Sequence, residues 1–502
     1  MNLAQLASTS AAVAATRSRL EKRSLIAALL SAAPPDEIDL AATYLSGTLR
    51  QRRTGVGWRG VGDLPAPAAE PTLSLVEVDA ALEAVSQLSG PGSATVRKEQ
   101  VRALFAALTA AEQELLRALV TGGVRQGALD SVMLDAIAVA ADVDLAAVRR
   151  AAMFSAPTGP VAVAALTGGV AALAAFDLVV GRPVRPMLAS SASGVTEAID
   201  GLPEGTVVVD TKLDGIRIQV HKQGDEVLVF TRSLDEIGGR LPGVVAAVQA
   251  LPADGLILDG EALLVDDAGR PRPFQETASE TASIGGTEAR PFFFDLLAHA
   301  GDALIERPGA ERWEQLDAVV PAELRTERLV TADPAEATAF FERVVAAGQE
   351  GVIVKDPAAP YAAGRRGAAW VKVKPRHTLD LVVLAVEWGS GRRRGLLSNI
   401  HLGARVAGTA DEFVMLGKTF KGMTDAVLAW QTERFTDLKT DDDGWAVTVR
   451  PEQVVEIAFD GVQRSTRYPG GVTLRFARVL RYRDDKTPAE ADTLDAVRAF
   501  LG

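Results

Sequence analysis

The spacing of hydrophobic residues predicts only helices in the first third of the chain. Apolar residues in the segment 101–108 recur at the i, i+3, i+4, i+7 spacing of an amphipathic helix. The next helix is bounded at both ends, because Thr109 and Glu112 fit a capping box and Gly122 follows the apolar stripe. We therefore expect an all-α domain over residues 1–180.

Beyond residue 180 the pattern changes from helical spacing to short β runs. A stretch rich in Pro, Gly and Ser at residues 181–194 predicts a linker or an extended lead-in. Apolar runs at residues 207–210, 216–220 and 227–230 follow, separated by turn signals. These runs predict a strand-rich α+β domain over residues 181–377.

After Pro375 the chain continues as β structure. Five apolar runs between residues 379 and 459 are separated by Gly and Asp turns, which is typical of a small β-barrel. A helical pattern begins at about residue 489. We therefore expect a C-terminal β-barrel over residues 378–502, and the length of 502 residues agrees with a three-domain protein.

Composition narrows the class of protein. Hydrophobic residues make up 48% and charged residues 24% of the chain, as in globular proteins, and no apolar stretch reaches the ~20 residues of a membrane span. We see no secretion signal, and without cysteine neither a disulfide nor a thiolate zinc site is possible, so a cytoplasmic protein is expected, nucleoid-associated if bacterial. The net charge of −12 argues against coating nucleic acid through bulk positive charge but allows local basic grooves.

The most informative chemical motif is TKLDGIR, which follows the apolar run at residues 207–209. A lysine amine attacks phosphorus only when it is unprotonated, and partial desolvation or neighbouring cations favour that form. Lys212 is therefore a candidate covalent nucleophile. Taken alone, the motif fits a solvated lysine at a strand end equally well.

Acidic residues downstream supply candidate partners for this lysine. Asp259 and Glu261 alternate in a predicted strand and so share a face, which also fits an ordinary exposed strand. Glu350 and Lys355 stand at the two ends of the apolar run 352–354. An acid and a lysine at the ends of a buried strand can converge on one pocket.

Three further segments add cations and aromatic rings. Lys372 and Lys374 share a face of a predicted strand, and two like charges so close together are usually either solvated or bound to an anion. Because Lys212 and the acids are also candidates for this site, we favour binding of a phosphate. The three phenylalanines at 292–294 fit plain core, or a ring that stacks on a purine. Four arginines within residues 475–483 would repel one another without anions nearby, such as polyphosphate or nucleic-acid backbone.

Seven segments in a fixed order resemble the successive motifs of ATP-dependent DNA ligases. They are KLDG, TRSLDE, LDGE, FFFDLL, EGVIVKD, WVKVK and RFARVLRYRDDK, between about Pro186 and Lys486. The helical region before them resembles the DNA-binding domain of larger ligases. The resemblance implies a nucleotidyltransferase middle domain, an OB-fold C-terminal domain, and nick sealing in three transfers: a lysine takes AMP from ATP, AMP passes to the 5′-phosphate, and the 3′-hydroxyl displaces AMP.

The resemblance also implies a role for individual residues. Lys212 would be the adenylated residue, Phe294 would stack on adenine, and Asp210 would contact the adenine amino group, although many relatives carry glutamate there. The remaining implied roles are contacts to the sugar by Arg217 and Glu261, to the α-phosphate by Lys372 and Lys374, to the ribose or nick phosphate by Arg232, on the phosphate side by Arg366, and to metal ions by Glu261 and Glu350.

The implied cofactors are ATP and Mg²⁺, with Mn²⁺ as an alternative, because carboxylate and phosphate oxygens without His or Cys suit these ions. Arg475 and the basic residues after it resemble the motif that orients pyrophosphate, which requires the C-terminal domain to close and later swing away about a hinge near Lys374 to Asp380. We expect a monomer that encircles nicked duplex DNA, and see no sliding-clamp peptide at either terminus.

Other functions remain open at this stage. An RNA ligase or a GTP-using capping enzyme uses the same lysine chemistry, although the helical region and the full C-terminal motif favour a DNA ligase. An NAD-dependent ligase is disfavoured, because its usual cysteine zinc site is impossible here. A non-catalytic clamp on nicked DNA is disfavoured by the intact Lys212, Glu261 and Glu350.

Overall fold

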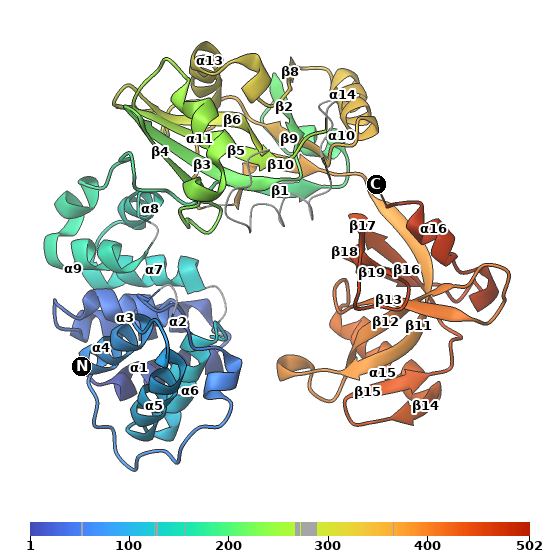
Figure 1. Cartoon of the computed structure of the whole chain (residues 1–502), viewed down its shortest axis with the longest axis horizontal. Coiled ribbons are helices and arrows are strands. Elements are labelled where there is room, and N and C mark those ends of the chain that lie inside the picture. The colour runs from blue at the N-terminus through green and yellow to red at the C-terminus, as the bar shows by residue number, and fades with distance from the viewer. Residues whose placement is uncertain are drawn as a thin grey trace.

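The computed structural model of the chain has three successive parts, arranged in an arc in Figure 1: a helical part, a middle part with two sheets and a C-terminal β part. It describes residues 1–51, 54–124, 126, 129–155, 157–266, 272, 289–364 and 366–501. Within these ranges, the helices are too short or too polar to cross a membrane.

The first part is all helical, as predicted, and its helices bury one continuous core that extends from Leu3 to Leu173. The capping box predicted at Thr109 is present, since its hydroxyl and its backbone N–H donate to Glu112 at 2.7 and 2.8 Å. The helices are α1 (Leu3–Ala15), α2 (Arg19–Ala32), α3 (Ile38–Leu45), η1 (Trp58–Val61), α4 (Leu75–Ser86), α5 (Ser93–Ala106), α6 (Ala110–Val120), α7 (Leu129–Ala141), α8 (Leu145–Met153) and α9 (Gly159–Ala174).

The middle part contains two five-stranded sheets, each packed against helices, and confirms the predicted α+β class. The first sheet has the order β1-β10-β9-β2-β8. Its strands are β1 (Leu188–Ala192), β2 (Val207–Lys212), β8 (Arg328–Thr331), β9 (Gly351–Lys355) and β10 (Arg366–Val373), and its helices are α10 (Val195–Asp200) and α14 (Pro334–Ala346).

The second middle sheet has the order β4-β3-β5-β6-β7 and packs against α11 and α13. Its elements are β3 (Ile216–Gln223), β4 (Glu226–Thr231), η2 (Gly238–Arg240), α11 (Pro242–Gln249), β5 (Leu256–Leu263), β6 (Arg290–His299), β7 (Asp302–Ala303), α13 (Gly309–Val319) and η3 (Ala322–Leu324). Since β2 belongs to the first sheet and β3 to the second, the KLDG segment crosses from one sheet to the other.

The C-terminal part is a β domain, as predicted, and its sheets are open instead of closing into a barrel. The long strand β11 (His377–Trp388) pairs with β16 through its first half and with β15 through its second half, and its pairing with β12 has a register shift at 383–385. Within the described residues, the edges of this sheet are not joined to each other. The other elements are η4 (Gly391–Arg393), β12 (Leu397–Arg405), β13 (Phe413–Thr419), α15 (Asp425–Asp437), β14 (Lys439–Asp442), β15 (Ala446–Val449), β16 (Val454–Phe459), β17 (Gly461–Arg464), β18 (Val472–Arg475), β19 (Arg478–Tyr482), η5 (Pro488–Glu490) and α16 (Leu494–Arg498).

Two helical features of the C-terminal part differ from the sequence expectation. Helix α15 was not predicted, and the final α-helix is only α16, which begins at Leu494 rather than near residue 489. The segment just before α16 forms the short 3-10 helix η5, which begins at Pro488.

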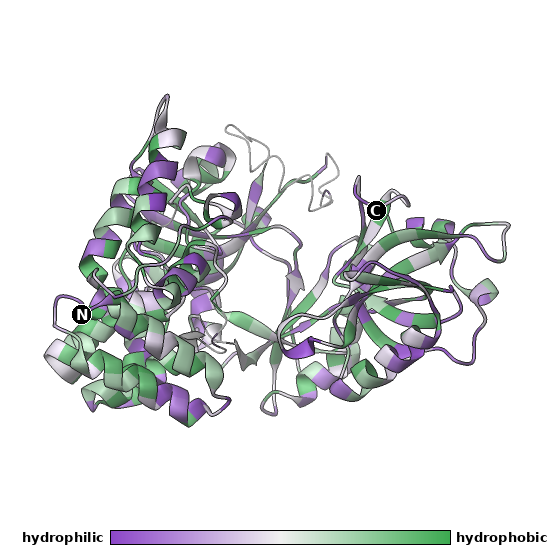
Figure 2. Cartoon of the chain, turned by 90° about the horizontal axis from the view of Figure 1, so that it is seen from below, coloured by the Kyte–Doolittle hydropathy of each residue, from purple (hydrophilic) through white to green (hydrophobic). Residues whose placement is uncertain are grey.

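The helical and middle parts form one body, beside which the C-terminal part lies (Figure 2). An apolar cluster joins them, in which Phe154 and Phe176 of the helical part contact the same core as Leu297 and Tyr361 of the middle part. The C-terminal part instead meets the middle part through polar contacts, described below. The interface on one side is therefore apolar and that on the other is charged.

Candidate active site

A cavity of about 840 Å³ lies between the two middle sheets, and the C-terminal part contributes to its wall. It collects nearly all of the residues predicted from the sequence as site residues. The predicted residues that line it are Asp210, Lys212, Arg217, Arg232, Glu261, Phe294, Glu350, Lys372 and Lys374. Arg366 is the first residue of β10, but its side chain lies outside the described part of the chain.

Lys212 is placed by the crossing between the sheets. It is the last residue of β2, and the loop after it packs against β5 so closely that a Cβ on Gly215 would lie 2.4 Å from the carbonyl oxygen of Ala262. The backbone N–H of Gly215 donates to Glu261 at 3.3 Å. Glycine is therefore required here, and it brings the nucleophile candidate and the acid onto one cavity.

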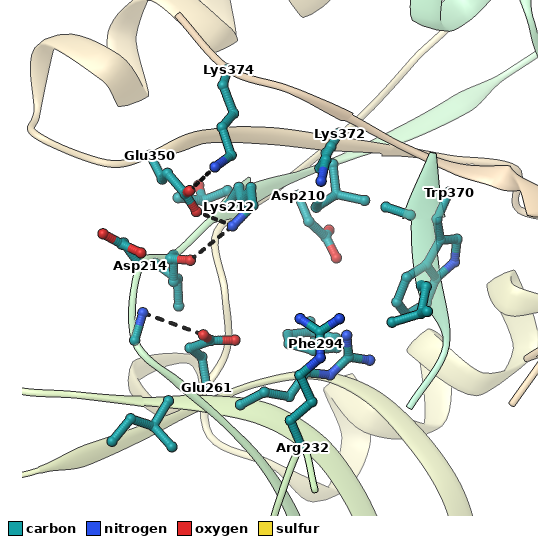
Figure 3. A pocket seen from close by; sticks show the side chains of 18 of the residues that line it. Asp210, Lys212, Asp214, Arg232, Glu261, Phe294, Glu350, Trp370, Lys372 and Lys374 are labelled. Atoms are coloured by element: carbon teal, nitrogen blue, oxygen red, sulfur yellow. Dashed lines mark hydrogen bonds and ion pairs between the residues drawn. The ribbon is translucent and has the colours of Figure 1, made fainter. Parts of the chain in front are cut away.

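Glu350 links the two lysines at this end of the cavity. Its carboxylate forms ion pairs with Lys212 and with Lys374, and its backbone N–H donates to the Lys212 carbonyl at 3.1 Å (Figure 3). Burial opposes the charge on Lys374, but Glu350 and Asp460 together raise its pKa above the usual value. Lys372 extends into the cavity from β10, the strand that ends just before Lys374 (Figure 3).

Glu261 is the carboxyl group most affected by its surroundings. Burial raises its pKa to about 7, Glu350 and Asp259 act in the same direction, and Lys212 and Arg217 oppose them. Within the described residues, no three His, Asp or Glu side chains gather closely enough to hold a metal by themselves. Mg²⁺ commonly uses only one or two carboxylates together with substrate phosphates, so Glu261 and Glu350 fit that mode of binding.

Arg217 forms the wall beside the aromatic residues. Its guanidinium donates two hydrogen bonds to the Asp259 carboxylate, at 3.0 and 2.6 Å. The guanidinium carbon lies 5.1 Å from the Phe294 ring centroid. Tyr361, which is fully buried, donates to the same Asp259 at 2.6 Å. The aromatic face of the cavity therefore rests on a hydrogen-bonded network with little freedom to move.

The C-terminal part contributes Arg475 and Phe476 to the cavity. Arg475 donates to Asp214 of the KLDG segment at 2.6 and 3.3 Å. Phe476 has the left-handed φ of 54°, which is costly for a phenylalanine, and its side chain is 55% exposed. Of the basic residues between positions 475 and 486, Arg475 is the one that lines the cavity.

Other basic residues of the same motif have local partners. Arg483 and Lys486 both donate to Asp380, at 3.2 and 2.6 Å, near the start of β11. Asp380 lies on β11, the first strand of the C-terminal part. In this arrangement Arg483 and Lys486 bind β11 instead of lining the cavity.

Sequence reasoning missed two residues that shape this site. Arg328 binds the buried carboxylate of Asp210, and Asp460 reaches Lys374 from the C-terminal part at 3.0 Å. Arg328 stands at the start of β8 with no motif around it, and Asp460 follows an ordinary strand. Lys355 was not missed, because the run 352–354 indicated that it shares a pocket with Glu350; it lines the cavity and also binds Asp210.

Comparison with known proteins matches the chain along most of its length. Residues 186–374 match the family described as "ATP dependent DNA ligase domain", residues 393–486 its C-terminal region and residues 59–138 the "DNA ligase N terminus". A probable DNA ligase of Beutenbergia cavernae is 63% identical over 514 residues that cover all of both chains. The chain belongs to the ATP-dependent DNA ligase family. It is thus an enzyme that uses ATP to form phosphodiester bonds in DNA.

Further relatives agree with this assignment. The probable DNA ligase of Mycobacterium marinum is 55% identical to this ligase and matches over the full length of both chains. The solved structure titled "Pmar-Lig_PreS3" has a TM-score of 0.65 and 18% identity, covering 95% of this chain and 99% of its own, and so shares the fold. These matches favour a DNA ligase over the RNA ligase, capping enzyme and non-catalytic clamp considered above.

Proposed function

We propose that this ligase seals nicks in duplex DNA through a lysyl-AMP intermediate on Lys212. The observation that carries the proposal is the convergence of Lys212, Lys372 and Lys374 on one cavity, which Glu261 and Glu350 also line. Positioning and charge neutralisation provide most of the catalysis in phosphoryl transfer. An amine at the end of a fixed strand, with two further lysines and two carboxylates on the same cavity, suits that chemistry.

The lysine would take part in two of three transfers. First, its amine forms a bond to the α-phosphorus of ATP, and the bond from that phosphorus to the pyrophosphate oxygen breaks. Next, an oxygen of the 5′-phosphate attacks the same phosphorus and the Lys212 amine leaves, which is possible because a phosphoramidate keeps the group activated. Finally, the 3′-hydroxyl attacks the 5′-phosphorus, the phosphodiester forms and AMP departs.

The other lining residues would bind and orient the substrates. Phe294 is in position to stack on the base, since its ring lies in the cavity beside Arg217 and Trp370. The remaining roles that we propose are contacts to the sugar by Arg217 and Glu261, to the α-phosphate by Lys372 and Lys374, to the adenine amino group by Asp210, to the ribose or nick phosphate by Arg232, and on the phosphate side by Arg366.

Glu261 and Glu350 would hold Mg²⁺, for which Mn²⁺ is a substitute. The fit rests on the hard oxygens of these two carboxylates, which line the cavity together with Lys212, Lys372 and Lys374, where we propose that the phosphates bind. Burial is the main cause of the raised pKa of Glu261, because it disfavours the charged carboxylate. A divalent cation beside the carboxylate would stabilise that charged form. Such an ion neutralises charge on the transferring phosphoryl group.

We infer that residues 1–180, 181–377 and 378–502 act as three domains that encircle the duplex. The division is supported by separate cores, one for the helical part and another for the C-terminal part. We further propose that the ligase works as a monomer in the cytoplasm, at the nucleoid if its organism is bacterial. Analytical ultracentrifugation with and without nicked DNA would test the monomer.

The decisive experiment is incubation of the protein with labelled ATP and Mg²⁺, followed by addition of a nicked duplex. Label should attach to the wild-type protein, leave as pyrophosphate is added, and move to DNA during sealing. Lys212→Ala should take no label and still bind DNA. Sealing by the Lys212→Ala variant, or label from GTP alone, would show that the proposal is wrong.

A further inference from the structure

The aromatic end of the cavity contains a buried carboxylate held by two cations. Asp210 is 1% exposed and accepts from Arg328 at 2.6 Å on Oδ1 and 2.9 Å on Oδ2, and from Lys355 at 2.5 Å on Oδ2. Burial opposes ionisation, but Lys355 and Arg328 together lower the pKa of Asp210 below its usual value. The group is therefore an ionised carboxylate, which only accepts hydrogen bonds.

Counting lone pairs shows what Asp210 can still bind. An ionised carboxylate has about four acceptor positions, two on each oxygen. Arg328 uses one on each oxygen and Lys355 uses the second on Oδ2. One position on Oδ1 is left for a donor from a ligand, and Asp210 lines the cavity where that ligand would lie (Figure 3).

Lys355 is directed at protein groups. Its ammonium lies 4.3 Å from the Trp370 ring centroid and 5.0 Å from that of Phe294, and it donates to Asp210 and, at 3.5 Å, to the Phe294 carbonyl. An ammonium has three N–H donors, and these contacts engage them. At this end the cavity thus offers a ligand an acceptor rather than a donor.

Arg328 also connects Asp210 to the aromatic residue beside it. The same Nη2 that binds Asp210 donates to the Phe294 carbonyl at 3.0 Å. The guanidinium of Arg328 also packs on the Trp313 ring, whose centroid lies 4.7 Å from the guanidinium carbon. The carboxylate and the stacking ring are consequently fixed relative to each other by one planar side chain.

We propose that Arg328 is the positioning residue that makes this ligase select a 6-amino purine, by orienting the free Oδ1 position of Asp210 toward the exocyclic amino group of the base. The inference rests on the proposed binding of AMP in this cavity with its base on Phe294. A 6-oxo purine would place an oxygen acceptor against the carboxylate. It would therefore be rejected by repulsion and by the unpaired buried groups that result.

The test compares three nucleotides in single-turnover formation of protein-bound nucleotide: ATP, purine riboside triphosphate, which lacks the 6-amino group, and inosine triphosphate. Wild type should prefer ATP to purine riboside triphosphate by about 10- to 100-fold, the usual effect of one hydrogen bond to a charged group. Arg328→Gln should reduce this ratio at least about fivefold. Arg343→Gln is the matched control, because Arg343 pairs with the neighbouring Glu327 on the surface and should keep the wild-type ratio.

A second variant decides the matter if Arg328→Gln does not fold. Asp210→Asn replaces an acceptor by an amide that can also donate, so it should raise the use of inosine triphosphate relative to ATP. Unchanged ratios in the folded variants would overturn the role of Arg328, while labelling by ATP would leave the proposed function intact. If wild type took no label from any of the three nucleotides, the proposed function itself would fail.

Discussion

The ion pair between Lys374 and Asp460 predicts that Asp460 helps to dock the C-terminal part on the active site, in addition to the contact of Arg475 with Asp214. The two side chains are 3.0 Å apart and are 19% and 20% exposed, so the pair is partly shielded from water. A charge-assisted hydrogen bond contributes about 1.5–3 kcal/mol when buried, and partial exposure reduces this to about 1–2 kcal/mol. Asp460→Ala should therefore lower the docked-to-undocked ratio by about 5- to 30-fold.

Two measurements would detect this shift. Because the chain has no cysteine, cysteines introduced at the exposed positions Glu204 and Asp411 can carry a donor and an acceptor dye that report the distance between the parts. We propose that Arg475 assists lysyl-AMP formation from its position in the cavity, so this step should slow in Asp460→Ala. Sealing of a nick that already carries AMP does not use ATP and should be affected much less.

The control for this prediction lies on β16, the strand that ends just before Asp460. Glu456 pairs with the exposed Arg481 inside the C-terminal part at 2.6 Å, so Glu456→Gln should change neither the dye distance nor the adenylation rate. The reasoning would be refuted if Asp460→Ala gave the wild-type distance distribution and the wild-type rate of lysyl-AMP formation. It would also be refuted if both variants slowed adenylation equally.

Three further predictions follow from buried groups and from charge. The pKa of Glu261 is about 7 in the folded protein and 4.5 for an ordinary glutamate, so between these pH values the folded state binds a proton that the unfolded state has lost. Without divalent metal, the free energy of unfolding should therefore fall by up to about 3 kcal/mol as the pH rises from 4.5 to 7. Urea titrations of Glu261→Gln should show no such dependence on pH. Arg312→Met leaves the fully buried Asp295 unpaired and should cost about 3–5 kcal/mol of unfolding free energy, whereas Arg325→Met, at a partly exposed pair with Asp317, should cost less than about 1 kcal/mol. Affinity for a nicked duplex should fall steeply between about 50 and 200 mM salt in binding titrations, and a flat response would contradict encirclement of the DNA.

Much of the site was predictable because its residues lie at the ends of strands with clear patterns. The alternation around Lys372 and Lys374 correctly gave a shared face, since both side chains line the cavity. Helix α6 was predictable from its capping box for the same local reason. Local patterns predict local geometry, since they involve neighbours within one turn or one strand.

Contacts between distant segments were not predictable. Asp210 and Arg328 are 118 residues apart, and the sequence around Arg328 has no feature that distinguishes it from a surface arginine. The C-terminal barrel was predicted from five apolar runs separated by Gly and Asp turns, but whether the sheet closes depends on which strands pair with each half of β11. Such pairings are set by tertiary packing, which a single sequence does not record.

The net charge of the chain does not show how its charged residues are distributed in the fold. The chain carries −12 overall, yet among the described residues the cavity is lined by seven Lys or Arg side chains and four Asp or Glu side chains. At neutral pH, Glu261 is only partly ionised, so the cavity is still more positive than this count. A local excess of cations inside a low-dielectric wall attracts polyphosphate more strongly than the same charges spread over a surface. The acidic remainder then limits non-specific binding to nucleic acid, so that affinity for DNA depends on the grooves and cavities where the cations are gathered.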